Sequence, residues 1–438
     1  MAENRLETIV TTYAEVLKQE DARVYELFDV EKETLDSGSI IINDPFPTLN
    51  RLREAAPVQK GALADLMGLA APGRHFTHHV PGHPTYTAFS FAAVSRAFIE
   101  NETFSSHAYE TTGATADMGD TILNRVGAAH RCMRGPIQPL FSPDAAETWW
   151  NQKIIDETVE TLISSIEKKK SADLFVELCA RMPVHVVSAG FGLAPDDIIS
   201  FRVALSPSHN ASAEVRREAN RRVRAMLLEV IQARRRKPEN DIISKLVAAE
   251  VTLDDGSVRP FTDDEIIGNC RLIVQAGGGT TWRQLGITLF ALLENPDQFE
   301  ALKADRSLAG RTVLESARWH ATDLVFPRQA AKDATLEGVE IPKGAILHLC
   351  LGAANRDPAR WEDAERFDIT RPVQRSLAFA AGPHSCLGQH VSRQEMVTAL
   401  NAVIDRLPNL RWDPSRPPAK LIGGLFMRGP NALPVVFG

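Results

Sequence analysis

The stretch LAFAAGPHSCLGQ, residues 377–389, places Cys386 after a turn rich in small residues and directly before a helical pattern. The first turn of a helix has free N–H groups, and these groups and the helix dipole stabilise an anion. The N–H groups of residues 387–389 would therefore lower the pKa of the Cys386 thiol. Glycines at positions 382 and 388 would let the backbone pass close to a flat, bulky group. Taken alone, the segment fits either a thiolate ligand or a buried structural cysteine.

The composition of the whole chain is that of an ordinary globular protein. The chain has 438 residues, of which 44% are hydrophobic and 24% charged, with a formal net charge of −7. These values exclude a disordered, collagen-like or coiled-coil chain, and nothing in the charge favours nucleic acid. No apolar run approaches the roughly 18 to 20 residues of a membrane-spanning helix, and the first 20 residues lack the apolar core of a secretion signal. We expect a cytoplasmic protein, a monomer, without membrane or nucleic-acid partners.

The cysteines and histidines give little support to other kinds of site. The five cysteines are widely spaced and form no CxxC pair, so neither a disulfide framework nor a zinc ribbon is indicated. Four histidines, His75, His78, His79 and His83, crowd one short stretch. Zinc would need three or four of them to converge, whereas an extended chain points neighbours to opposite faces. Solvated strand histidines are the favoured interpretation over a zinc site.

The periodicity predicts a mainly α fold with a minor β region in one domain, residues 1–438. Short strands and turns are expected at 46–91 and 325–350, and helices at 120–320 and 387–407. The longest helix is expected at 263–295, because the segment opens with acidic residues, is apolar nearly all round and stops before Pro296.

That long helix contains an unusual run, Ala276-Gly277-Gly278-Gly279-Thr280-Thr281. Each glycine inside a helix costs about 1 kcal/mol relative to alanine, so the run needs a reason. Close approach of the helix to a flat cofactor, with a widened groove for dioxygen, would supply one. A phosphate-binding loop is unsupported, because neither GxxxxGK[ST] nor a strand-linked GxGxxG is present.

Phe379-x-x-Gly382-x-x-x-Cys386-x-Gly388 resembles the cysteine-ligand loop of the haem-thiolate monooxygenases, the cytochrome P450 superfamily. The resemblance implies the family's triangular, mainly helical fold, with haem b (iron protoporphyrin IX) between the Gly-rich helix and the Cys386 helix. It makes Cys386 the metal ligand. It also places Phe379, Gly382 and Gly388 of the loop, and Ala276 and Gly277 of the long helix, against the haem.

Further landmarks carry the resemblance over nearly the whole chain. His130-x-x-x-Arg134, together with Arg328 and His384, matches the family's ligands of the haem propionates. Charge-assisted hydrogen bonds of this kind are strong. Glu315-x-x-Arg318, with Arg366 in AERF, resembles the buried Glu–Arg–Arg cluster that fixes the cysteine loop.

The threonine motif departs from the family at one position. Thr280 occupies the family's threonine position, which the resemblance makes catalytic, but Gly279 stands where the family usually has Asp or Glu. The second proton source must then be a water chain, the substrate, or another side chain such as Gln275 or Arg283. A peroxide-driven peroxygenase or an atypical haem-thiolate enzyme is therefore the alternative to a monooxygenase that uses O2.

The resemblance also implies the substrate side of the haem and the partners. Its family-equivalent pocket residues are Ile273, Ala276, Gly277, Thr280, Leu324, Val325, Phe326 and Phe426. A mobile lid is expected at 107–120. The implied reaction inserts one oxygen atom of O2 into an apolar small molecule by hydroxylation or epoxidation. No flavin, iron–sulfur or dinucleotide motif is present, so electrons are expected from a ferredoxin and its reductase.

Overall fold

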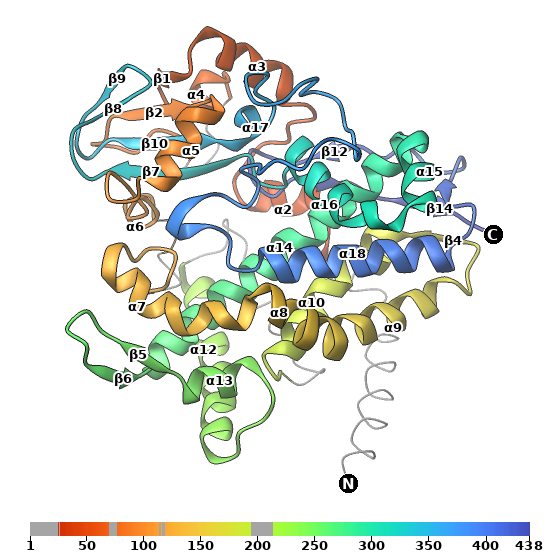
Figure 1. Ribbon diagram of the computed structural model, residues 1–438, viewed down its shortest axis with the longest axis horizontal. Coiled ribbons are helices and arrows are strands. Elements are labelled where there is room, and N and C mark those ends of the chain that lie inside the picture. The colour runs from red at the N-terminus through yellow and green to blue at the C-terminus, as the bar shows by residue number, and fades with distance from the viewer. Residues whose placement is uncertain (1–24, 26, 70–76, 114, 116–118, 194–212) are drawn as a thin grey trace.

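The structure is a computed structural model and describes residues 25, 27–69, 77–113, 115, 119–193 and 213–438 (Figure 1). A five-stranded sheet lies at one end of the molecule, and most of the helices lie away from it. The long helix α14 (Asp263–Glu294) runs through the middle, with α18 (Gln389–Arg406) packed beside it. Within the described ranges, no helix is both long and apolar enough to cross a membrane.

The sheet joins segments far apart in the sequence. Its strand order is β1 (Val58–Lys60), β2 (Thr85–Ala88), β10 (Ile346–Cys350), β7 (Val325–Ala330) and β3 (Phe104–Ser105). Strand β10 is parallel to β2 and antiparallel to β7, where Leu347 lies opposite Arg328. Smaller groups of strands are β11 (Arg411–Trp412), β14 (Pro434–Val436) and β4 (Ser171–Asp173); β12 (Leu421–Ile422) and β13 (Gly429–Pro430); β5 (Glu250–Thr252) and β6 (Val258–Pro260); β8 (Ala334–Leu336) and β9 (Val339–Ile341).

Helices account for most of the other described residues. The α-helices are α2 (Val30–Asp36), α3 (Phe46–Ala55), α4 (Leu63–Leu66), α5 (Phe91–Ile99), α6 (Ala108–Thr111), α7 (Gly127–Ile137), α8 (Pro143–Ala145), α9 (Asp156–Ile166), α10 (Arg181–Gly190), α12 (Ala213–Arg236), α13 (Ile242–Ala248), α15 (Pro296–Ala304), α16 (Ala309–Trp319) and α17 (Leu351–Ala354). The 3-10 and π-helical segments are η1 (Gln138–Phe141), η2 (Ala146–Ile155), η3 (Phe175–Ala180), η4 (Arg306–Leu308) and η5 (Gly382–His384).

Local signals explain the bounds of α14. The Thr262 side chain accepts the N–H of Glu265, and the Glu265 carboxylate accepts the N–H of Thr262, which forms a capping box at the start. The helix ends at Glu294, directly before Asn295 and Pro296. Trp282, fully buried in its middle, packs on Phe175 with ring centroids 4.7 Å apart. The predicted long helix is thus confirmed within one residue.

The predicted strands at 325–350 are present as β7 to β10, but the expectation for 46–91 was partly wrong. Residues Phe46–Ala55 form helix α3, and among the described residues of that region, 46–69 and 77–91, the strands are β1 and β2. The reason is that Pro47 lies at the start of the helix, where a proline is tolerated, and Phe46 and Leu49 are buried one helical turn apart.

Candidate functional site

The Cys386 loop is closed by its own backbone. The N–H of Cys386 donates to the carbonyl of Phe379 at 2.9 Å, and the N–H of Ser385 donates to Gly382 O at 3.0 Å. Ala380 and Gly382 have φ values of +54° and +70°. These bonds turn the chain sharply and deliver Cys386 to the start of α18.

The Cys386 thiol combines exposure with desolvation. It is the exposed cysteine among the five free ones. Burial of its surroundings raises its pKa, while the N–H groups of Gly388 and Gln389 and the charge of Arg134 act in the opposite direction. The predicted support from the helix start is present, but desolvation outweighs it. Protein atoms therefore surround the sulfur, although the residue as a whole keeps accessible surface.

Helix α14 presents an accessible spot in its otherwise buried middle. Gln275 and Ala276 are exposed and Gly277 and Thr280 are half-buried, whereas most neighbouring residues of the helix are buried. The Thr280 hydroxyl donates to Ala276 O at 2.8 Å. Accessible residues in the middle of a central helix are expected where a ligand covers that helix. Three of them, Ala276, Gly277 and Thr280, are predicted site residues.

Four predicted basic residues lie together. The rings of His130 and His384 stack with centroids 4.0 Å apart, and Arg134 Nη2 donates to Ser385 O at 2.7 Å. Burial, followed by charge interactions with His130, Arg328 and Arg134, lowers the pKa of His384 to about 2. Burial and the charges of Arg134 and Arg131 lower that of His130 to about 4. Burial and the neighbouring arginines therefore disfavour a positive charge on either histidine.

The cluster has unused donors. His130 Nε2 and Arg328 Nε are buried and have no hydrogen-bond partner among the described residues. Arg328 is 2% exposed, and its Nη1 donates to Pro327 O at 2.8 Å. No ion pair with a described carboxylate involves Arg134 or Arg328 within 4.0 Å. The group that satisfies such a cluster carries negative charge.

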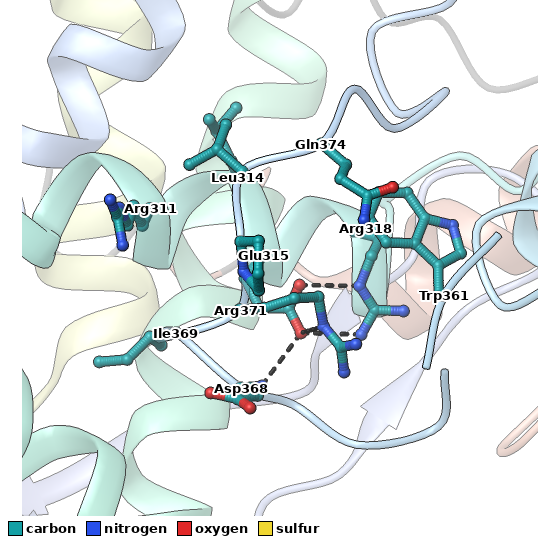
Figure 2. A pocket seen from close by; sticks show the side chains of 11 residues that line it. Arg311, Leu314, Glu315, Arg318, Trp361, Asp368, Ile369, Arg371 and Gln374 are labelled. Carbon is teal, nitrogen blue, oxygen red and sulfur yellow. Dashed lines mark hydrogen bonds and ion pairs between the residues drawn. The ribbon is translucent and has the colours of Figure 1, made fainter. Parts of the chain in front are cut away.

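A buried ion cluster supports the loop that leads to Cys386 (Figure 2). Arg318 pairs with Glu315 through two bonds of 2.7 and 2.8 Å, and both side chains are buried. The third member is Arg371, whose Nε lies 3.4 Å from Glu315 Oε1. Arg318 also donates to Asn355 O, and Asn355 Oδ1 accepts the N–H of Leu377, at the start of the cysteine loop.

The prediction of Arg366 as the third member was wrong. Arg366 contributes its carbonyl, which accepts from Arg318 Nη2 at 2.9 Å, and its side chain makes no ion pair with Glu315. Both arginines follow Glu315 by about 50 residues in an irregular loop. Spacing alone could not separate them, because such a loop has no periodicity that fixes which side chain turns inward.

Comparison with known proteins decides the family. Residues 194–433 match the family described as Cytochrome P450. The chain belongs to the cytochrome P450 family. It is 34% identical to Cytochrome P450 105C1 of a Streptomyces species over 61% of this chain and 68% of that one. It is 28% identical to Cytochrome P450 monooxygenase PikC of Streptomyces venezuelae, over 92% of this chain and 94% of that protein.

Solved structures agree with that assignment. CYP109E1 from Bacillus megaterium, in complex with corticosterone, is 26% identical and has a TM-score of 0.76. The match covers 90% of this chain and 98% of that one. The protein therefore has the cytochrome P450 fold and is an oxidoreductase of the monooxygenase class, whose cofactor is haem b.

The residues of this P450 fit haem b. The two unpartnered basic nitrogens suit the two carboxylates of the porphyrin, and the accessible Cys386 thiol suits the iron. A Cβ on Gly388 would meet no described atom within 4 Å, so this side of the loop is open for a planar group. Among the four basic residues, His384 already has a hydrogen-bond partner, because its Nε2 lies 3.1 Å from Ser106 Oγ.

Several glycines of this P450 also allow close packing between parts of the chain. A Cβ on Gly382 would lie 2.6 Å from Phe98 O, so this glycine admits the backbone of α5. On α14, a Cβ on Gly277 would meet Val187 at 3.3 Å, and one on Gly278 would meet Val184 at 3.9 Å. Both valines belong to α10. Close packing therefore explains Gly382 and favours glycine at position 277, whereas at position 278 an added Cβ would make an ordinary contact.

The predicted apolar pocket residues of the P450 divide into two groups. Phe326 and Phe426 are half-buried and pack edge to face, with ring centroids 5.4 Å apart. Leu324 and Val325 are fully buried in a core cluster with Leu49. They were wrongly placed in the pocket, because side chains without accessible surface offer none to a ligand. Ile273, 9% exposed, contributes little.

The other predictions for this P450 concern its flanking segments. Among the described histidines, His83 Nδ1 lies 2.8 Å from Gly344 O and His79 Nδ1 lies 3.3 Å from Thr85 Oγ1; His75 is outside the described residues. The described part of the chain holds no group of three metal-binding side chains. In the predicted lid, residues 114 and 116–118 are outside the described residues, and its mobility stays a prediction.

Sequence reasoning missed one acidic residue of this P450. Asp323 is 8% exposed and directly precedes Leu324, between α16 and β7. Its only sequence signal is an acid inside an apolar run, which without the structure cannot be distinguished from a surface turn.

Proposed function

We propose that residues 1–438 form one haem-thiolate monooxygenase domain, a monomer, that inserts one oxygen atom of O2 into an apolar small molecule. The observation that carries the proposal is the accessible Cys386 thiol at the start of α18, next to a cluster of basic side chains without carboxylate partners. In this proposal Cys386 is the iron ligand.

Each part of the site would have its own role toward the haem. His130, Arg134 and Arg328 would hold the propionates, with His384 beside them. His130 Nε2 and Arg328 Nε are buried donors without a described partner, and Arg134 has no described carboxylate within 4.0 Å. The N–H groups of Gly388 and Gln389, with Arg134, would stabilise the Cys386 thiolate. The haem, when bound, supplies activation of dioxygen and the oxidising chemistry. Thr280, half-buried on α14, would offer its hydroxyl to the oxygen site.

The substrate class follows from the half-buried aromatic pair Phe326 and Phe426, with Ala276 and Gly277 on α14. Apolar and aromatic walls favour an apolar ligand, which they bind through burial of its surface. The 26% identical CYP109E1 was solved with corticosterone and with testosterone, which supports a hydrophobic substrate of this kind here.

Electrons would come from a ferredoxin-type donor and its reductase, since the chain lacks flavin and iron–sulfur motifs. The net reaction consumes O2, two electrons and two protons, and releases one water with the oxygenated product.

The test is the absorption spectrum of the reduced, carbon monoxide-bound protein. We expect a thiolate-type Soret band in the wild type and its loss in Cys386→Ser, with the band unchanged in the control Cys132→Ser. Titration with steroids and other apolar ligands should then give spin-state shifts. A histidine-type band in the wild type, or a thiolate band that survives in Cys386→Ser, would contradict the proposal.

A second candidate function is a peroxide-driven peroxygenase, which Gly279 favours because the usual acid is missing there. It predicts turnover with hydrogen peroxide alone and none with O2 and an electron donor.

A further inference from the structure

We infer that Asp323 replaces the acid that α14 lacks at Gly279: it holds a proton for the oxygen site and passes it toward Thr280. The inference rests on the proposed O2-dependent function. It concerns the second proton source, which neither the motif nor the relatives identify.

Asp323 and Gly279 share two neighbours. Asp323 Oδ1 accepts the N–H of Met427 at 2.9 Å, and a Cβ on Gly279 would lie 3.4 Å from Met427 Cε. Arg283 donates to the carbonyl of Gly279, and its charge also acts on Asp323. A carboxyl therefore lies one side chain away from the position where the family's acid would stand.

The second oxygen of Asp323 is available for a proton. Met427 occupies Oδ1, and Oδ2 makes no hydrogen bond with any residue in the described part of the chain. Phe426, which we place in the substrate pocket, directly precedes Met427 in the sequence. A carboxyl with one anchored and one free oxygen can carry a proton on the free oxygen, because the anchor fixes its direction.

The charges around Asp323 set its proton affinity. Burial raises its pKa to about 6, against the opposing effects of the Met427 N–H and of Arg283. Arg283 is itself paired with Glu33 of α2, which reduces its effect on Asp323. Tyr109 of α6 also senses the charge of Asp323, and burial raises the pKa of its phenol, which stays neutral. An acid with a pKa near the working pH both releases and regains protons readily.

The proton balance closes without a net change at Asp323. Neutral Asp323 gives up one of the two protons consumed per O2, becomes a carboxylate, and regains a proton from water before the next cycle. The two electrons come from the ferredoxin-type donor, and the second oxygen atom leaves as water.

The variant Asp323→Asn removes the proton and keeps the carbonyl that accepts the Met427 N–H. We expect product formed per electron with O2 to fall at least about tenfold. Turnover driven by hydrogen peroxide, which brings its own protons, and substrate affinity by spin-state titration should stay within about twofold. The control Asp357→Asn removes another buried carboxyl, whose two oxygens accept the N–H groups of Phe91 and Ala359 at 2.8 and 3.0 Å. It should change none of these.

A readout independent of turnover is the infrared band of protonated carboxylic acid in the resting ferric protein. The difference between wild type and Asp323→Asn should contain one such band that titrates near pH 6. Absence of that band, or an equal loss of O2-driven and peroxide-driven turnover, would overturn the inference and make Asp323 a structural or substrate-binding group.

Gly279→Asp tests whether proton delivery is deficient in a chain without an acid at that position of α14. As the single change in an otherwise wild-type chain, Gly279→Asp should alter the product formed per electron with O2 by less than about twofold. A several-fold gain would overturn the role of Asp323. Failure of the proposed function is seen separately, as the absence of a thiolate-type spectrum or of any O2-driven turnover in the wild type.

Discussion

At the scale of single residues, the buried carboxyl of Asp323 makes stability depend on pH. Its pKa is raised from 3.8 to about 6, so the folded state favours the neutral form. The contribution of Asp323 to the free energy of unfolding is therefore fully present below about pH 4, and it is lost as the pH rises through 6. Asp323→Asn should therefore stabilise the protein by up to about 3 kcal/mol at pH 8 and not at pH 4. Urea unfolding at both pH values measures this, and an equal effect at both would contradict the raised pKa.

A side chain at position 382 should destabilise the protein for steric reasons. Its φ is +70°, and a Cβ would lie 2.6 Å from Phe98 O and 2.9 Å from Ile99 Cα. Because both atoms belong to backbone, Gly382→Ala should cost about 2 kcal/mol or more in the free energy of unfolding. The control is Gly388→Ala, where a Cβ meets nothing within 4 Å and the stability should change by less than about 1 kcal/mol. Equal losses in urea unfolding would show that the contact with α5 is not the cause.

At the scale of elements, the sequence predicts best where a local rule fixes the geometry. The capping residues and Pro296 set the ends of α14, and the spacing around Cys386 placed it directly before α18. The helix Phe46–Ala55 was missed because proline and glycine nearby outweighed its apolar spacing. Asp323 was missed for a different reason: its hydrogen-bond partner is the N–H of Met427, 104 residues later in the chain. Contacts between residues so far apart in the chain produce no periodic pattern in the sequence from which they could be predicted.

Variants in the loop between α17 and the cysteine loop test whether Arg371 or Arg366 is the third member of the ion cluster of Glu315. Arg371 contacts buried Glu315 and also donates to the carbonyls of Glu362 and Asp363, so it holds the loop at several points. Arg371→Gln should lower stability by about 1 to 3 kcal/mol and speed loss of haem to an acceptor protein. Arg366→Gln should stay within about 0.5 kcal/mol, because the backbone carbonyl remains. The reverse order would restore the original prediction.

At the scale of the whole molecule, the pair Glu33–Arg283 ties the N-terminal helix α2 to the centre of α14. The Arg283 side chain is fully buried and that of Glu33 is 29% exposed. Without Glu33, the partners of Arg283 among the described residues are the Gly279 carbonyl and the face of Trp282, 4.2 Å away. Since an uncompensated buried charge is costly, Glu33→Gln should lower the free energy of unfolding by about 2 to 4 kcal/mol. The exposed Glu31→Gln, on the same helix, should change it by less than about 0.5 kcal/mol.

The variant Glu33→Gln should also change the titration of Asp323, the proposed proton donor. An Arg283 released from Glu33 would act more strongly on Asp323, because the positive charge would no longer be compensated, and would favour the carboxylate. The infrared band of Asp323 should then titrate below about pH 6 in Glu33→Gln and stay unchanged in Glu31→Gln. O2-driven coupling should fall at neutral pH and recover as the pH is lowered, whereas peroxide-driven turnover should not follow it. An unshifted band would mean that Arg283 does not connect the two carboxyls, and that α2 contributes to stability alone.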